Sequence, residues 1–229
     1  MRTLSNSAGN IRNLLVRSRR AIRFLRMYKK YSAFTMAPAK LFWFNLLIVD
    51  EVRHVNGCVI ECGVWRGGMS AAIAEVLGPD REYFLFDSFE GLPPATAMDG
   101  QKAVAWQQDT QGVYYFDNCR APVELAEKAM LMSTVPMYKI VKGWFDKTLE
   151  GFVPPCPIAV LRVDGDWYDS TMVVFDRLFK FMADDGIIIV DDYYTWDGCS
   201  RAVHDFLSRC KSTARITQRY GICVIKPRL

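Results

Sequence analysis

Four aspartates lie just beyond two short apolar runs of the sequence. Asp164 and Asp166 follow IAVLRV (158–163), and Asp191 and Asp192 follow GIIIV (186–190). If these runs are neighbouring parallel strands, about 4.8 Å apart, acids at their carboxyl ends can converge on one ion. Clustered carboxylates repel one another and raise one another's pKa unless a cation or a shared proton intervenes. Such hard oxygen ligands, with room for water, suit Mg²⁺, so the pattern predicts a metal site.

Helix capping is the alternative explanation for acids in these positions. Asp169 or Ser170 can cap the helix expected over 170–182, and Asp197 can cap the helix that follows. Capping leaves the two pairs of aspartates at the strand ends unexplained. A divalent cation stabilises the conjugate base of a hydroxyl, and a nearby carboxylate can take the proton. A bound cation with an adjoining carboxylate can therefore activate a hydroxyl group.

A glycine-rich turn, ECGVWRGGMS (61–70), follows the first expected strand. Glycine lets the backbone approach a ligand closely, and the N-terminus of the next helix offers free amides. A nicotinamide dinucleotide calls for GxGxxG, whereas Gly63 here is followed by Gly67 and Gly68, so the spacing fits a cofactor without a pyrophosphate. Asp87, which ends YFLFD (83–87), can accept hydrogen bonds from ribose hydroxyls. The two features together favour an adenosyl ligand.

Short β-type runs alternate with helical stretches through most of the chain. The expected strands are 58–62, 83–87, 138–141, 158–163 and 186–190, and the expected helices are 41–55, 68–77, 123–132, 170–182 and 201–210. Apolar strands separated by helices are typical of a parallel sheet covered on both faces. The runs 214–220 and 222–226 are too close for a helical crossover and should pair antiparallel. We expect an α/β, Rossmann-like, mostly parallel seven-stranded sheet with a C-terminal antiparallel hairpin, which resembles the class I methyltransferase arrangement.

One connection, residues 88–122, is unusually long for a compact domain. Loops beyond about 12–15 residues are usually functional or disordered. This one contains the aromatic residues Trp106, Tyr114, Tyr115 and Phe116. We therefore expect an ordered lid over the site.

Five motifs in this order, ECGVWRGGMS, FDSFEGLP, KGWFDKTL, RVDGDWYDST and VDDY, resemble the macrocin O-methyltransferase (TylF-like) family of S-adenosylmethionine-dependent enzymes. The resemblance runs from about Asn56 to the C-terminus. It implies that the methionine and ribose of the cofactor lie against Glu61, Gly63, Gly67 and Ser70, that the ribose is held by Asp87 and Ser88, and that the adenine is flanked by Gly143 and Trp144. It assigns Asp164, Asp191 and Asp192 to the metal ion and Asp166 to the general base.

The resemblance implies a Mg²⁺-dependent O-methyltransferase that moves a methyl group from S-adenosylmethionine to a hydroxyl of a small molecule. A sugar of a glycosylated natural product or glycan is the preferred acceptor, and a phenol is the other. The family also implies a homo-oligomer. Two alternatives stay open: a NAD-dependent oxidoreductase, which the glycine spacing disfavours, and a noncatalytic membrane-docked binding module, which the N-terminal segment suggests.

Positive charge is concentrated at the N-terminus. Residues 1–49 hold ten of the 29 Lys and Arg and none of the 25 Asp and Glu, so the rest of the chain is acidic although the net charge is +4. We expect a basic helical arm over 1–45 and a methyltransferase domain over 46–229. The arm is amphipathic, with one face of Ile11, Leu14, Leu15, Ile22 and Leu25 and a neighbouring face of Phe24, Met27, Tyr28 and Tyr31.

The arm has two interpretations as a contact surface. It could dock on its own domain or on a dimer partner, or residues 1–40 could contact an anionic membrane surface. Nucleic acid is disfavoured as a partner, because the remainder of the chain is acidic and lacks a recognisable binding module.

The cysteines and the apolar runs indicate the compartment. Seven scattered cysteines argue for reduced, mostly buried thiols, and no CxxC pair or histidine cluster suggests zinc. The apolar run 41–49 is too short to span a bilayer, and no secretory signal precedes it. We expect a cytoplasmic protein, with peripheral membrane attachment as the alternative.

Overall fold

The computed structural model describes residues 20–227. Seven strands form one sheet in the order β3-β2-β1-β4-β5-β7-β6. Their bounds are β1 Cys58–Cys62, β2 Tyr83–Asp87, β3 Tyr138–Lys142, β4 Ile158–Val163, β5 Met182–Val190, β6 Arg215–Arg219 and β7 Ile222–Lys226. The first five strands are parallel, whereas β7 pairs antiparallel with both β5 and β6. The structure thus confirms the predicted class I methyltransferase sheet.

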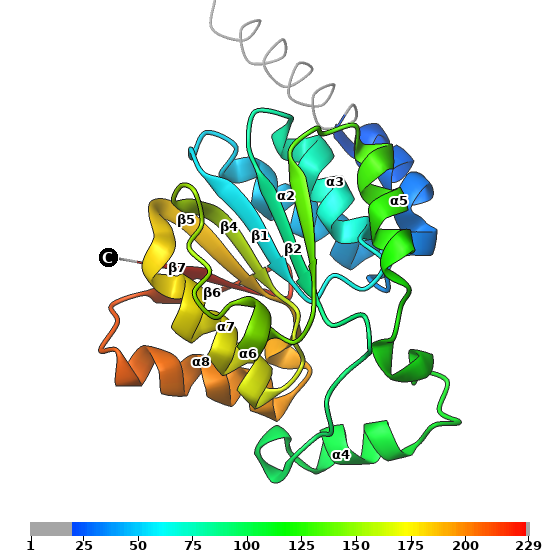
Figure 1. The fold of residues 1–229 in the computed structure, drawn as a ribbon, viewed down its shortest axis with the longest axis vertical. Coiled ribbons are helices and arrows are strands. Elements are labelled where there is room, and N and C mark those ends of the chain that lie inside the picture. The colour runs from blue at the N-terminus through cyan, green and yellow to red at the C-terminus, as the bar shows by residue number, and fades with distance from the viewer. Residues whose placement is uncertain (1–19, 228–229) are drawn as a thin grey trace, which may run out of the picture.

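Helices cover both faces of the sheet (Figure 1). The first face carries a helix over 20–31 together with α2 (Ala39–Glu51), α3 (Gly68–Leu77) and α5 (Val123–Ser133). The second face carries α6 (Phe145–Thr148), α7 (Tyr168–Leu178) and α8 (Asp197–Arg209). A further short helix, α4 (Gln101–Gln108), lies within the long connection, away from the sheet (Figure 1).

The apolar runs form the central strands because every residue of β1 and β4 is buried, as a strand covered on both faces requires. The strands β4 and β5 are parallel neighbours, with Val163 paired to Val190. Asp164 and Asp191 are therefore the first residues beyond two adjacent strand ends. This is the arrangement on which the predicted metal site depends.

The predicted helix caps are wrong. The helices α7 and α8 follow Trp167 and Trp196, and neither of these N-cap side chains makes a capping hydrogen bond. Asp169 lies two residues after Trp167 and Asp197 one residue after Trp196, both in first turns, where the helix dipole favours negative charge. The amide of Tyr168 is instead bound by Asp99 Oδ1, at 2.7 Å, from the long connection.

The described part of the basic arm packs on the domain. Phe24, Met27 and Tyr31 are buried in the hydrophobic cluster that includes α2 and α3, whereas Ile22 and Leu25, on the other predicted face, are 50% and 56% exposed. Ile11, Leu14 and Leu15 lie outside the described residues. Within residues 20–227 no one helix combines the length and apolarity needed to cross a bilayer. The helices Arg20–Phe34 and Ala39–Glu51 meet that test only jointly, as a pair bent by 118°.

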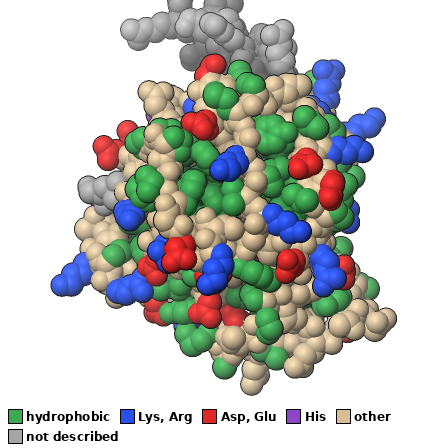
Figure 2. Space-filling view, viewed as in Figure 1, with side chains coloured by type: hydrophobic (Ala, Val, Ile, Leu, Met, Phe, Trp, Pro, Cys, Tyr) green, Lys and Arg blue, Asp and Glu red, His purple; other side chains and the backbone are tan. Residues whose placement is uncertain are grey.

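On the face shown in Figure 2, basic and acidic side chains are interspersed rather than gathered in separate areas. All seven cysteines fall within the described residues and are free thiols, four of them buried: Cys58, Cys62, Cys199 and Cys223.

Candidate active site

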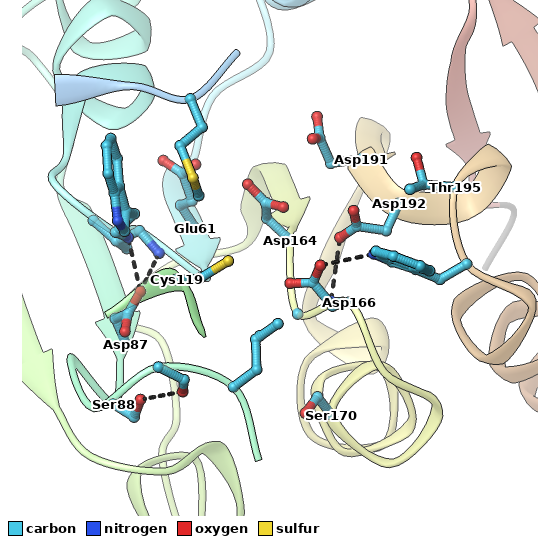
Figure 3. A pocket seen from close by; sticks show the side chains of 18 of the residues that line it. Glu61, Asp87, Ser88, Cys119, Asp164, Asp166, Ser170, Asp191, Asp192 and Thr195 are labelled. Carbon is cyan, nitrogen blue, oxygen red and sulfur yellow. Dashed lines mark hydrogen bonds between the residues drawn. The ribbon is translucent and has the colours of Figure 1, made fainter. Parts of the chain in front are cut away.

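A cavity of about 730 Å³ lies at the carboxyl ends of β1, β2, β4 and β5. Ligands of open α/β sheets bind at this edge. The long connection forms one wall of the cavity, and residues 34–38 with Leu41 form another. In Figure 3, Glu61 and Asp87 lie on one side, the four aspartates lie on the other, and Cys119 lies between them.

Glu61 is a buried acid in the middle of the core. It sits in β1 with 3% of its side chain exposed, accepts a hydrogen bond from Ser70 Oγ of α3, and is 2.6 Å from Arg162 Nη1. Burial raises the pKa of Glu61 to about 7, although Arg162 and Ser70 act in the opposite direction. A carboxylate held this way can accept a hydrogen bond from a ligand in the cavity.

Gly63 is a position where a side chain cannot be accommodated. Its φ is +92°, and a Cβ there would lie 1.7 Å from the carbonyl oxygen of Asp164. The amide of Asp164 donates to the carbonyl of Cys62 at 2.8 Å. This close approach of the ends of β1 and β4 brings the glycine-rich turn next to the aspartates.

Asp87 organises the glycine-rich turn from the end of β2. Its Oδ2 accepts the amides of Val64 and Trp65 at 2.6 and 2.8 Å, and its Oδ1 accepts the amide of Phe89 at 2.6 Å. Burial raises the pKa of Asp87, and the three amide hydrogen bonds counteract this rise. The sequence pattern suggested a ribose ligand for this residue but did not reveal its bonds to the turn.

The other predicted cofactor residues divide into two groups. Ser88 and Trp144 line the cavity together with Glu61, Gly63 and Asp87. The remaining three support the wall from behind: Gly67 at the N-cap of α3, Ser70 against Glu61, and Gly143, whose amide donates to the carbonyl of Asp87.

Three of the four aspartates form a compact group of carboxylates. Asp164, Asp166 and Asp192 each offer an oxygen, and these atoms lie within 4.8 Å of one another. Burial raises the pKa of Asp166 and of Asp192 well above the ordinary range, and repulsion from neighbouring carboxylates adds to it. A hard divalent cation would relieve this repulsion, so the donor set fits Mg²⁺.

Asp191 lies beside this group but faces Arg162. The guanidinium of Arg162, 3% exposed in β4, is 2.6 Å from carboxylate oxygens of Glu61, Asp164 and Asp191. Burial raises the pKa of Asp191, and the guanidinium counteracts this effect. Arg162 thus links the glycine-rich end of the cavity to the aspartate end.

Asp166 has an unusual backbone and a separate hydrogen-bond partner. Its φ is +56°, a left-handed conformation that Asp and Asn tolerate better than most residues. Its amide donates to Asp192 Oδ2 at 3.2 Å, and its Oδ1 accepts the indole Nε1–H of Trp196 at 2.9 Å (Figure 3).

The expected aromatic lid is present over the cavity. Trp106 of α4 packs against both Trp167 and Trp196, with ring centroids 6.2 and 5.7 Å away. The indole of Trp167 donates to the carbonyl of Pro93 at 2.9 Å. These contacts join the long connection to the loops that carry the aspartates.

Sequence reasoning missed several residues of the site. The sequence contains a signal for Arg162, because an arginine alone in the apolar run 158–163 must find buried partners. Trp196 and Cys119 gave none, since their direction depends on the folded loops. The sequence also does not indicate that residues 34–38 and Leu41 line the cavity, because their position groups them with the basic arm and not with the domain.

Comparison with known proteins places the chain in a family. A sequence model described as "Macrocin-O-methyltransferase (TylF)" matches residues 35–225, beginning upstream of residue 56, where the expected resemblance starts. The chain is 33% identical, over 163 residues, to an 8-demethyl-8-(2,3-dimethoxy-alpha-L-rhamnosyl)-tetracenomycin-C 4'-O-methyltransferase of Streptomyces olivaceus, covering 68% of this chain and 59% of that one. It is 31% identical, over 166 residues, to a mycinamicin III 3''-O-methyltransferase of Micromonospora griseorubida, covering 68% and 62%.

These curated relatives are longer, and the chain spans about three fifths of their length. Among solved structures, the O-methyltransferase NovP is similar, with a TM-score of 0.68 and 26% identity over 85% of this chain and 82% of that one. The fold, the motifs and the extent of the family match lead to one conclusion: the chain belongs to the macrocin-O-methyltransferase family.

Proposed function

We propose that this protein is an S-adenosylmethionine-dependent O-methyltransferase that requires a divalent cation, Mg²⁺ by preference. The observation that carries the proposal is one cavity with two chemically different ends. Glu61 and Asp87 provide acceptors for an adenosyl ligand at one end, and the aspartates provide a site for a cation and a base at the other. Membership of the family supports methyl transfer as the reaction.

The acceptor in this proposal is a sugar hydroxyl on a glycosylated natural product or glycan. One relative is named for 4'-O-methylation of a tetracenomycin that carries a rhamnosyl group, and another is named for 3''-O-methylation of mycinamicin III. A sugar with vicinal hydroxyls offers two oxygens to a hard cation, as Mg²⁺ prefers.

Cofactor binding is assigned to the turn after β1 and to the ends of β2 and β3. Glu61 and Asp87 accept hydrogen bonds from the cofactor, Gly63 allows its close approach, and Gly67 is the N-cap of α3 behind this wall of the cavity. Ser70 orients Glu61, and Ser88, Gly143 and Trp144 complete the ribose and adenine end.

The cation is assigned to Asp164 and Asp192, which belong to the compact carboxylate group, and to Asp191, which faces Arg162 in the structure and which the family resemblance adds as the third ligand. When bound, it would stabilise negative charge on the reacting oxygen of the acceptor. Arg162 balances part of the carboxylate charge and holds Asp164 and Asp191 in place. This arrangement keeps the aspartates together before ligands arrive.

Asp166 acts as the general base. Its Oδ1 is occupied by Trp196, which leaves Oδ2 to accept the proton of the acceptor hydroxyl. As the bond from the sulfonium sulfur to the methyl carbon breaks and the bond from the acceptor oxygen forms, that proton passes to Asp166. The lid excludes water, so the contribution of the protein is mostly alignment.

Methyl transfer from deuteromethyl S-adenosylmethionine tests the proposal directly. The purified chain with Mg²⁺ is incubated with alkyl rhamnosides and catechol, and mass spectrometry detects the added label. Labelled rhamnoside supports the proposal, whereas label on catechol alone contradicts the sugar assignment. Calorimetry that shows binding of NAD but not of S-adenosylmethionine contradicts the whole assignment.

A further inference from the structure

The indole of Trp196 makes a hydrogen bond that the family comparison and the sequence motifs leave without a role. Its Nε1–H donates to Asp166 Oδ1 at 2.9 Å. Asp164 and Asp191 are held by a cation, Arg162, whereas Asp166 is held by a neutral donor. A neutral donor fixes the direction of a carboxylate without pairing its charge, which suits a group that must accept a proton.

The backbone around Trp196 fixes its position at the start of α8. Its amide donates to the carbonyl of Asp192 at 2.9 Å, and its carbonyl accepts the amide of Ser200 at 3.2 Å. This bond connects Trp196 to Asp192, and Asp192 Oδ2 in turn accepts the amide of Asp166. The amide and the carboxylate of Asp166 are thus both hydrogen-bonded to the segment that follows β5.

Two aromatic rings and one lysine pack against the ring of Trp196. The rings of Trp167 and Trp106 lie 5.3 and 5.7 Å from it, between centroids. Lys102 Nζ lies 5.0 Å from the centre of its ring and donates to the carbonyl of Thr195 at 2.9 Å. Because Lys102 and Trp106 both belong to the long connection, this connection supports the indole that donates to Asp166.

We propose that Trp196 is a positioning residue that fixes the Asp166 carboxylate for proton transfer. This inference rests on the proposed function, since it presupposes that Asp166 is the base. A buried indole also needs a hydrogen-bond acceptor for stability alone. The two roles differ in their effect on catalysis, because a structural role has no reason to depend on the Asp166 side chain.

The test is a double-mutant cycle with Trp196→Phe and Asp166→Asn in the full chain with Mg²⁺. Phenylalanine keeps an aromatic ring in the cluster and removes the N–H, and asparagine tolerates the left-handed backbone of residue 166. Trp196→Phe should lower kcat about 10- to 100-fold, part of the contribution of a general base, with KM for S-adenosylmethionine and an alkyl rhamnoside changed less than threefold. In the Asp166→Asn background it should have no further effect.

Trp167→Phe is the matched control, because Trp167 belongs to the same aromatic cluster but donates its N–H to Pro93. Its effect on the rate should be the same in both backgrounds. Equal losses from Trp196→Phe in both backgrounds, or an unchanged kcat, would overturn the proposal while leaving the proposed function intact.

A readout without turnover separates the contact from the activity. In ¹H–¹⁵N spectra the indole signal absent from Trp196→Phe identifies Trp196, and in Asp166→Asn this signal should move upfield as its charged acceptor is lost. An unmoved signal overturns the proposal. If the signal moves but no sugar or phenol is methylated, the proposed function fails, and the positioning role fails with it although the contact is real.

Discussion

Replacement of Arg162 by methionine should destabilise the fold in a pH-dependent way. Methionine is a flexible apolar side chain that fills irregular space, so the variant removes the charge while keeping most of the volume. Breaking a buried ion pair by removing one partner costs about 3–5 kcal/mol, because the other charge is left buried without compensation. Asp164 and Asp191 are 30% and 29% exposed and regain water, whereas Glu61 is 3% exposed. We therefore expect the free energy of unfolding to fall by about 3 kcal/mol at pH 8, the lower end of this range. Most of this loss comes from the uncompensated charge of Glu61.

The pH dependence of this loss follows from the pKa of Glu61. In the native protein burial already raises it from the ordinary 4.5 to about 7, and removal of Arg162 raises it further. Between pH 4.5 and this raised value, the folded variant holds a proton that its unfolded chain has released, so its stability falls as pH rises. The loss relative to wild type should be smaller at pH 5.5 than at pH 8.

Urea denaturation followed by circular dichroism, with EDTA present so that no cation replaces the guanidinium, measures the free energy of unfolding at both pH values. Arg209→Met is the matched control, because Arg209 pairs with Asp176 on the surface, where both side chains are exposed. That pair should contribute less than about 1 kcal/mol. If Arg162→Met costs no more than Arg209→Met, or costs the same at pH 5.5 and pH 8, the reasoning is refuted.

Two further substitutions test the turn at the cofactor end. Gly63→Ala should lower the free energy of unfolding by more than about 2 kcal/mol, because strain at positive φ adds to the clash with Asp164. Gly221→Ala controls for the backbone strain alone, because Gly221 has a φ of +85° and open space around it. Equal losses from the two substitutions would contradict the clash. Asp87→Asn should weaken S-adenosylmethionine binding in calorimetry about 10-fold or more, since hydrogen bonds to a charged group are lost. Glu90→Gln, at an exposed residue nearby, should leave the affinity unchanged. Equal affinities of the two variants would remove Asp87 from the cofactor site.

The sheet could be predicted because its strands are continuous apolar runs bounded by turns. The bounds of β1, β2, β4 and β7 agree with the expectation, and so do those of α3. The strand β5 begins at Met182, earlier than expected, because Asp184 and Asp185 are exposed in its first half and interrupt the apolar pattern. The short helix α4 was not predicted, since QKAVAWQQ has little apolar periodicity and is held by tertiary contacts of the lid.

The site was predictable at the level of which loops meet, because parallel strands end at one edge of a sheet. The direction of each side chain was less accessible. Asp191 and Asp192 are adjacent in sequence, yet one faces Arg162 and the other joins the carboxylate group, because the chain leaves β5 at Val190 and enters a short 3-10 helix. Similarly, nothing in VDDYYTW indicates that Trp196 turns back to Asp166.

Cation dependence of methyl transfer is the measurement closest to the central claim, that aspartates at the ends of β4 and β5 hold a divalent cation beside the cofactor. The full chain is freed of cations with EDTA, and the label transferred from S-adenosylmethionine to an alkyl rhamnoside is followed before and after MgCl₂ is restored. We predict a loss of at least about 100-fold that Mg²⁺ reverses, as expected when a Lewis acid that contributes several kcal/mol is removed. An undiminished rate in the chelated protein would contradict the account.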